Sequence, residues 1–215
     1  MAKFIKDIHD LVDFLAGKNL ANKQPPEKID QVLYEVVIDL FNENYKVYVK
    51  TQEISDFLLA FKRIKRVTAT GNVATLPGDY QHMRAIRTVA GGKVDLVEDK
   101  FWDGRKNSRV APPSQTNPIA RIEVPEADPA GRMIEMYPGQ DLVLEYFKTP
   151  VKPVYAYDIQ GTRYVYNDAA SVDVDFGPLL FPEIKTRVLS QLGVNLRDRD
   201  LTQYAEQTKR NEAPK

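Results

Sequence analysis

Residues 51–70 have the sequence TQEISDFLLAFKRIKRVTAT, and within them the pattern of the chain changes from helical to extended. Apolar side chains in the first half recur at helical spacing, at Ile54, Phe57, Leu58 and Phe61. This spacing predicts a short helix over 52–61, with Thr51 as its N-cap. From about Ile64 onward, short runs rich in Val, Ile, Leu, Tyr and Thr are separated by turn residues, which predicts strands.

Two more helices are predicted before this point. Residues 4–15 have an amphipathic pattern that stops at Gly17. A second helix begins after Pro25-Pro26, because proline suits a first helical turn, where its missing amide hydrogen would have no partner. Its apolar stripe runs to Phe41, and we expect residues 42–44 to end it.

The middle of the chain predicts a β-rich core. Candidate strands follow one another up to about residue 150, and Gly91-Gly92 is a hairpin signal between two of them. Residues 98–109 interrupt this pattern as a short helix or turn that carries the only tryptophan. Residues 151–176 are rich in tyrosine, and we expect them to be extended and partly irregular.

Helical spacing returns near Pro178 and stops before Gly193, and a polar segment follows. The expected fold class is therefore α+β, with N-terminal helices, a central antiparallel β-sheet or barrel-like domain, and a C-terminal helix with an extended tail. The predicted divisions are 1–61 for the helical region, 62–176 for the β-rich core and 177–215 for the C-terminal helix and arm. Together they form one compact domain with a C-terminal extension.

The composition excludes several classes of chemistry. The 215 residues include no cysteine and two histidines, which excludes disulfides, thiolate nucleophiles, Cys-based zinc sites and His-rich metal clusters. No apolar run approaches the roughly 20 residues that cross a bilayer, and no signal-peptide pattern begins the sequence. We expect a soluble protein made in a cytoplasm, with no membrane partner. Lys and Arg balance Asp and Glu at 30 each, so net charge does not draw the whole chain to nucleic acid.

Catalytic motifs are also missing from the sequence, which contains no nucleophile elbow, P-loop, dinucleotide fingerprint or zincin motif. His9 is expected on the solvated side of its helix, and His82 has no recognisable catalytic partner nearby. Asp173 and Asp175 would point the same way on a strand, where a solvated edge is favoured over a metal or acid–base site. We therefore expect no enzyme activity and no cofactor.

A basic run is the strongest electrostatic feature, with four cations in five residues at Lys62, Arg63, Lys65 and Arg66. Three interpretations remain open for this charge patch: a solvated strand edge protected against aggregation, contact with an acidic neighbouring subunit, or contact with DNA. Arg84, Arg87 and Lys93 are candidates to extend it. Trp102 is expected to be a core anchor and not a base-stacking platform.

The order of several passages resembles the head-to-tail connector, adaptor and neck-ring proteins of tailed phages, particularly short-tailed and crAss-like ones. A helix precedes the first strand, an LPGDY passage runs into a strand, an aromatic turn leads through prolines, and a Tyr-Pro turn joins two strands. These passages are TQEISDFLLAFKR (51–63), VATLPGDYQHMRAI (73–86), KFWDGRKNSRVAPPSQTNPIARIE (100–123) and MIEMYPGQDLVLEYFKTPVKP (133–153). The resemblance spans roughly residues 28–212 and includes the closing helical segment.

The resemblance implies a virion structural protein of the phage neck or tail. It implies a homo-oligomeric ring, often twelve-fold, that bridges the portal protein and other tail or ring proteins and surrounds the DNA channel without reading sequence. The C-terminal arm is the candidate interface with a neighbour, through Leu196, Arg197, Arg199, Leu201, Tyr204, Lys209 and Arg210. Two alternatives are a nucleic-acid-binding accessory protein that uses the charge patch, and a carboxylate-based hydrolase that uses Asp173, Asp175 or Glu183.

Overall fold

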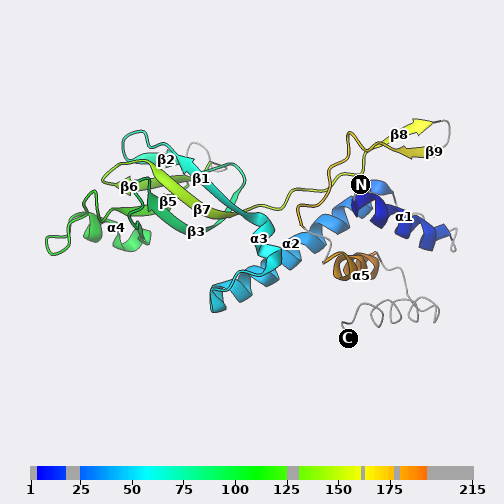
Figure 1. Cartoon of the computed structure of the whole chain (residues 1–215), viewed down its shortest axis with the longest axis horizontal. Coiled ribbons are helices and arrows are strands. Elements are labelled where there is room, and N and C mark those ends of the chain that lie inside the picture. The colour runs from blue at the N-terminus through cyan, green and yellow to red at the C-terminus, as the bar shows by residue number, and fades with distance from the viewer. Residues whose placement is uncertain (1–3, 18–24, 125–130, 161–162, 177–179, 193–215) are drawn as a thin grey trace. The chain divides into compact units, whose positions relative to one another are not determined.

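The structure is a computed structural model, and it describes residues 4–17, 25–124, 131–160, 163–176 and 180–192. The chain divides into two compact units (Figure 1). The first, which we call the helical unit, combines residues 1–60 with residues 150–215. The second, the β unit, is residues 61–149 and is inserted between the two parts of the first.

Helices dominate the described part of the helical unit: α1 (Phe4–Gly17), α2 (Pro26–Thr51), α3 (Asp56–Phe61, which ends at the boundary) and α5 (Phe181–Gln191). The strands β8 (Tyr157–Gln160) and β9 (Arg163–Tyr166) form an antiparallel two-stranded hairpin. The helices α1, α2 and α5 contact one another. The unit therefore joins the first third of the chain to its last third.

The core of the helical unit is aromatic where these distant segments meet. The ring of Phe4 in α1 stacks on that of Phe181 in α5 at 3.7 Å, and Phe176 contacts both rings edge-on. The Phe57 ring, from α3, lies 5.6 Å from that of Phe176. Offset and edge-on ring pairs add to the hydrophobic stabilisation from burial alone. The buried stripe of α2 completes this core with Ile29, Leu33, Val36, Val37, Leu40 and Phe41.

Local chemistry explains where α1 and α2 begin and end. The backbone amides of Phe4 and Ile5 donate hydrogen bonds to the Asp173 carboxylate, at 2.8 and 3.1 Å, so a distant residue caps α1. Pro26 occupies the first turn of α2, as predicted. Gln52 is the C-cap of α2. Its backbone is left-handed, and its amide donates a hydrogen bond to the Tyr48 carbonyl at 2.7 Å.

Two predicted boundaries were wrong. The second helix does not end at 42–44: its backbone stays helical to Thr51, and the side chain of Asn44 donates to the Leu40 carbonyl within the helix. Thr51 is therefore the last residue of α2 and not an N-cap. The next helix, α3, begins four residues later than predicted, and Ser55 caps it by accepting from the Leu58 amide at 3.3 Å.

The β unit contains two sheets. Its elements are β1 (Lys62–Val67), β2 (Val73–Thr75), β3 (Tyr80–Thr88), β4 (Asp95–Leu96), α4 (Asp99–Lys106), β5 (Ile119–Glu123), β6 (Met133–Tyr137) and β7 (Leu142–Lys148). The three-stranded sheet has the order β1-β7-β3 and is antiparallel. The four-stranded sheet has the order β2-β6-β5-β4, and only its β4–β5 pair is parallel.

Apolar side chains from both sheets form one core cluster in the β unit. Alternate residues of β7 point into it, and it includes Val67, Ala74, Leu76, Ile86, Val94, Ala120, Ile134, Met136, Leu142, Leu144 and Tyr146.

A close backbone contact joins two loops of the β unit. A Cβ atom on Gly139 would overlap the carbonyl oxygen of Gly71, so only glycine fits at this position without movement.

The α+β class predicted from the sequence is confirmed, but the barrel-like arrangement is corrected, because the strands form separate open sheets and not a closed barrel. The division of the chain also differs from the predicted one. Residues 150–176 cluster with the helices and not with the β unit, because Phe176 and the segment before it pack against α1 and α3. Within the described ranges, no helix has the length and apolar character needed to cross a membrane.

Candidate functional site

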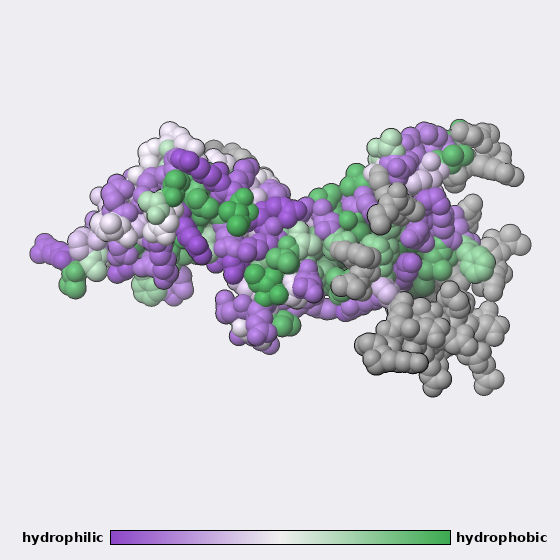
Figure 2. Space-filling model, in the orientation of Figure 1, coloured by the Kyte–Doolittle hydropathy of each residue, from purple (hydrophilic) through white to green (hydrophobic). Residues whose placement is uncertain are grey.

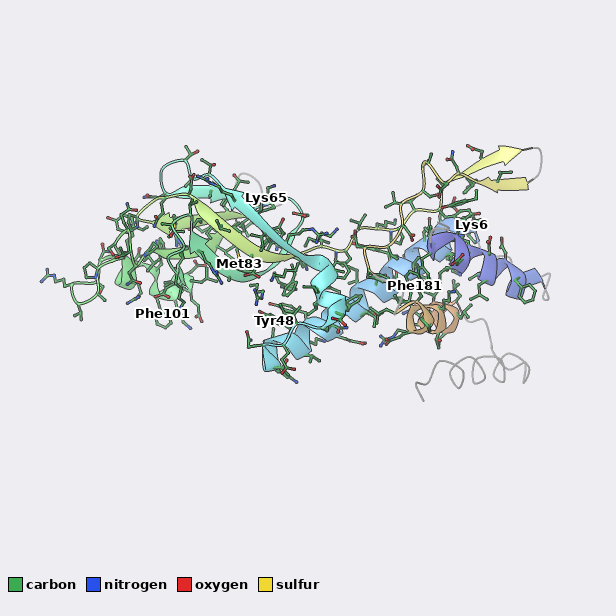
Figure 3. The ribbon with its side chains drawn as sticks, viewed as in Figure 1. Lys6, Tyr48, Lys65, Met83, Phe101 and Phe181 are labelled. Carbon is green, nitrogen blue, oxygen red and sulfur yellow. The ribbon has the colours of Figure 1, made fainter. Side chains whose placement is uncertain are left out.

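The four cations of the charge patch all lie on β1, an edge strand of the three-stranded sheet. Their side chains alternate between the two faces of the strand, so they do not form one cluster. Lys62 is paired with Glu145, and Arg66 is paired with Asp141 at 2.9 Å. The guanidinium of Arg63 donates to the Lys62 carbonyl at 2.8 Å, and Lys65 is exposed (Figure 3).

Glu145 links the patch to β3. This residue lies in the central strand β7 and is only 9% exposed, and its side chain pairs with Lys62 from β1 and with Arg84 from β3. Burial opposes ionisation of this carboxyl, but the hydrogen bond from Lys62 and the charge of Arg84 outweigh it, so the pKa of Glu145 is lowered. Arg84 therefore joins the patch, as the sequence suggested, through an acid that the sequence analysis did not single out.

A groove opens beside β3 on the β unit. After the Gly91 turn, the chain pairs back on β3, where the Val94 amide donates to the Ile86 carbonyl at 3.4 Å. At Asp95 it leaves β3 and pairs with β5 as β4, so this one segment passes from the three-stranded sheet to the four-stranded sheet. The groove has a volume of about 1250 Å³ and is lined by β3, residues 91–98 and α4.

Cations and exposed apolar side chains line this groove together. The cations are Arg84, Arg87, Lys93, Lys100 and Arg105, against the acids Asp95 and Glu98. Leu96 and Phe101 are 53% and 56% exposed, which is high for large apolar side chains. Figure 3 labels Met83 on β3 and Phe101 on α4, which both line the groove, and Figure 2 shows green apolar side chains among hydrophilic ones on the visible face of this unit.

Arg84 adds a specific feature to the groove wall. Its Nε is buried and has no hydrogen-bond partner among the described residues, while its Nη1 pairs with Glu145. A buried donor without a partner costs free energy, and such groups in native structures call for an explanation. The groove can therefore offer positive charge and an apolar surface to a bound group.

The two histidines lie in different environments. His9 was predicted to be solvated, but it is 4% exposed and its Nε2 lies 2.8 Å from Asp30 Oδ1, because α1 packs this side against α2. Its ring also stacks on Tyr155 at 4.0 Å. His82 lies in β3, as predicted, and burial together with the charge of Arg132 lowers its pKa. The His9 pair belongs to the core of the helical unit.

The acidic candidates have structural contacts. Asp173 caps α1, and Asp175 accepts a hydrogen bond from the Val151 amide at 3.2 Å. Glu183 accepts from Arg187 one turn later in α5. Within the described ranges, no group of three or more His, Cys, Asp or Glu side chains is placed to hold a metal ion.

Trp102 is confirmed as a core anchor. It is 2% exposed, and the Arg121 guanidinium lies 4.9 Å from its ring centroid. All seven residues of the candidate arm lie outside the described residues: Leu196, Arg197, Arg199, Leu201, Tyr204, Lys209 and Arg210.

No protein-family model matches the chain, and no curated protein matches it significantly.

The groove was not predicted from the sequence. Arg84, Arg87 and Lys93 were considered as extensions of the charge patch, but Lys100 and Leu96 were not, because the lining residues come from separate elements that meet only in the fold. One sequence signal was available: residues 62–109 hold eleven cations and five acids, a larger excess than in any other part of the chain.

Proposed function

We propose that the chain is a structural subunit that assembles with copies of itself into a ring in the neck or tail of a tailed phage. In this proposal it is part of the virion, contacts the portal protein and other tail or ring proteins, and surrounds a channel through which DNA passes without sequence recognition. It acts by assembly and not by catalysis.

One observation carries the proposal: the two units differ in sign of charge. The β unit holds fourteen Lys and Arg against eleven Asp and Glu, and the helical unit holds sixteen against nineteen. Opposite charge on two parts of one subunit favours head-to-tail contact between copies, since the positive part of one faces the negative part of the next. Contacts of this heterologous kind produce a ring when the rotation closes.

Two of the passages that resemble phage connector proteins, residues 73–86 and most of residues 133–153, pack together in the β unit. The LPGDY passage and the last β-rich passage meet through β3 and β7, which pair along most of their length. Asp79 accepts a hydrogen bond from the Tyr146 hydroxyl at 2.9 Å, and its carbonyl accepts from the Thr149 amide at 2.7 Å. Their contact supports the view that these two passages belong to one structural unit.

The ion pairs of the charge patch weigh against the nucleic-acid alternative. Lys62 and Arg66 already neutralise Glu145 and Asp141, which leaves less charge for phosphates. A protein that binds DNA through such a patch loses affinity steeply with salt, and substituting the four cations with Gln would abolish that dependence.

Light scattering of the purified full-length chain, followed by electron microscopy, tests the assembly. We expect oligomers that include closed rings, and the same chain in virions beside the portal. A protein that stays monomeric at high concentration, is missing from particles and does not bind portal or other ring proteins would refute the proposal.

A further inference from the structure

The groove of the β unit has the properties of a docking site for a negatively charged, partly apolar surface. Lys93 and Lys100 have side chains 86% and 65% exposed at its rim, and each also pairs with a nearby acid. Arg87 has no ion-pair partner in the described part of the chain. Phe101 and Leu96 supply exposed apolar area beside these cations.

We propose that this groove binds the acidic face of α1 from a second copy of the chain. The inference rests on the self-assembly proposed above and names the surfaces that meet in it. The mode is a helix laid into a groove, in which apolar side chains enter and charged side chains pair at the rim.

The surface of α1 has the complementary composition. Asp7, Asp10 and Phe14 are spaced three and four residues apart, so they lie on one face of the helix, and Asp13 lies beside them. All four are exposed, with Phe14 at 63%. Asp7 and Asp13 have no hydrogen bond or ion pair among the described residues, and Asp10 pairs only with Lys6 of its own helix. Carboxylates and an exposed aromatic ring thus stand together.

Other acidic surfaces of the helical unit fit less well. On α2, Glu27 accepts from the Tyr157 hydroxyl, Glu35 from the Gln31 amide and Glu43 from Arg187, so these acids already have partners. The C-terminal segment 193–215 holds five cations and four acids, so its charge does not complement a basic groove. Asp39 of α2 is exposed and has no ion pair among the described residues, but only α1 brings several exposed acids together beside an exposed aromatic ring. Charge and apolar surface together therefore favour α1.

Charge reversal on each side of the contact tests the inference. The groove variant carries Lys93→Glu and Lys100→Glu, both at exposed positions. The helix variant carries Asp10→Lys and Asp13→Lys, which leaves Asp7 near the positive end of the helix dipole. The matched control is Lys65→Glu with Arg109→Glu, which reverses two exposed cations of the β unit outside the groove. Circular dichroism checks folding, and Asp10→Asn with Asp13→Asn replaces a helix variant that unfolds.

Self-association is measured by analytical ultracentrifugation at low salt. We expect each variant alone to associate about tenfold more weakly or worse, because like charges then meet. An equimolar mixture restores association, since each basic surface again faces an acidic one in an alternating assembly. The control associates like the unchanged chain.

The outcomes separate this inference from the proposed function. If the unchanged chain is monomeric, the proposed assembly fails and the inference with it. If it assembles but the groove variant assembles equally well, only the inference is overturned. Weakened variants whose mixture does not recover overturn the pairing of groove and α1. A groove variant that keeps self-association and loses salt-dependent binding of duplex DNA assigns the groove to nucleic acid instead.

Discussion

Replacing Asp30 with alanine gives the most direct test of how the helical unit is held together. Asp30 is 6% exposed in α2, and its two carboxylate oxygens have different partners. Oδ1 lies 2.8 Å from His9 Nε2 in α1, and Oδ2 accepts from the Tyr155 amide at 2.9 Å. One side chain therefore joins three segments that are far apart in the sequence.

The expected cost follows from the groups that lose a partner. Each buried polar group left unsatisfied costs about 1–3 kcal/mol, and Asp30→Ala leaves two, so we expect a loss of about 3 kcal/mol in the free energy of unfolding. At an m-value of about 2 kcal/mol/M, the urea midpoint falls by about 1.5 M. Asp39→Ala is the control, because Asp39 is exposed on the same helix, and it should change stability by less than about 0.5 kcal/mol.

Two optical probes follow the two units separately. Far-UV circular dichroism is dominated by the helical unit, and the fluorescence of Trp102, the only tryptophan, reports on the β unit. We expect Asp30→Ala to lower the urea midpoint measured by circular dichroism more than the midpoint measured by Trp102 fluorescence. A change below about 1 kcal/mol would refute the role assigned to this carboxylate, and so would a His9→Ala, Asp30→Ala double variant whose two effects simply add.

Three other substitutions test separate parts of the fold. Gly139→Ala should destabilise the β unit by about 1–3 kcal/mol, measured by Trp102 fluorescence in urea, while Gly78→Ala, which has open space for a Cβ, should be near neutral. The lowered pKa of Glu145 means that its contribution to stability is present above the ordinary glutamate pKa of about 4.3 and is lost as pH falls through the folded value. The stability difference between the unchanged chain and Glu145→Gln should therefore shrink between pH 6 and pH 3, and a constant difference would contradict this. Asp173→Ala removes the cap of α1 and should cost about 1 kcal/mol by circular dichroism, whereas Asp168→Ala should cost less.

Periodicity in the sequence identified most elements of the fold, but it could not place their ends. The stripe of α2 was clear because its apolar residues repeat regularly, whereas residues 42–44 look like a stop and are helical because tertiary packing outweighs their weak preference. His9 was misplaced for a related reason. A polar residue on a helix is usually solvated, and only the position of Asp30 in the folded chain makes burial favourable.

The candidate site was harder to predict than the fold. The run at Lys62–Arg66 is visible in the sequence because its cations are adjacent, yet the structure spreads them over the two faces of β1. The groove is invisible in the sequence because Arg87, Lys93 and Phe101 come together only where the chain passes from one sheet to the other. Spacing alone carries no information about such a crossing.

The insertion of the β unit has a consequence for synthesis. Lys62 and Phe147 are paired in neighbouring antiparallel strands, so the inserted unit begins and ends at adjacent points and can close as soon as β7 emerges from the ribosome. The rings of Phe4 and Phe57 must wait for Phe176 and Phe181, more than a hundred residues later. The N-terminal helices are thus made first and completed last, and until then their apolar faces are available to chaperones.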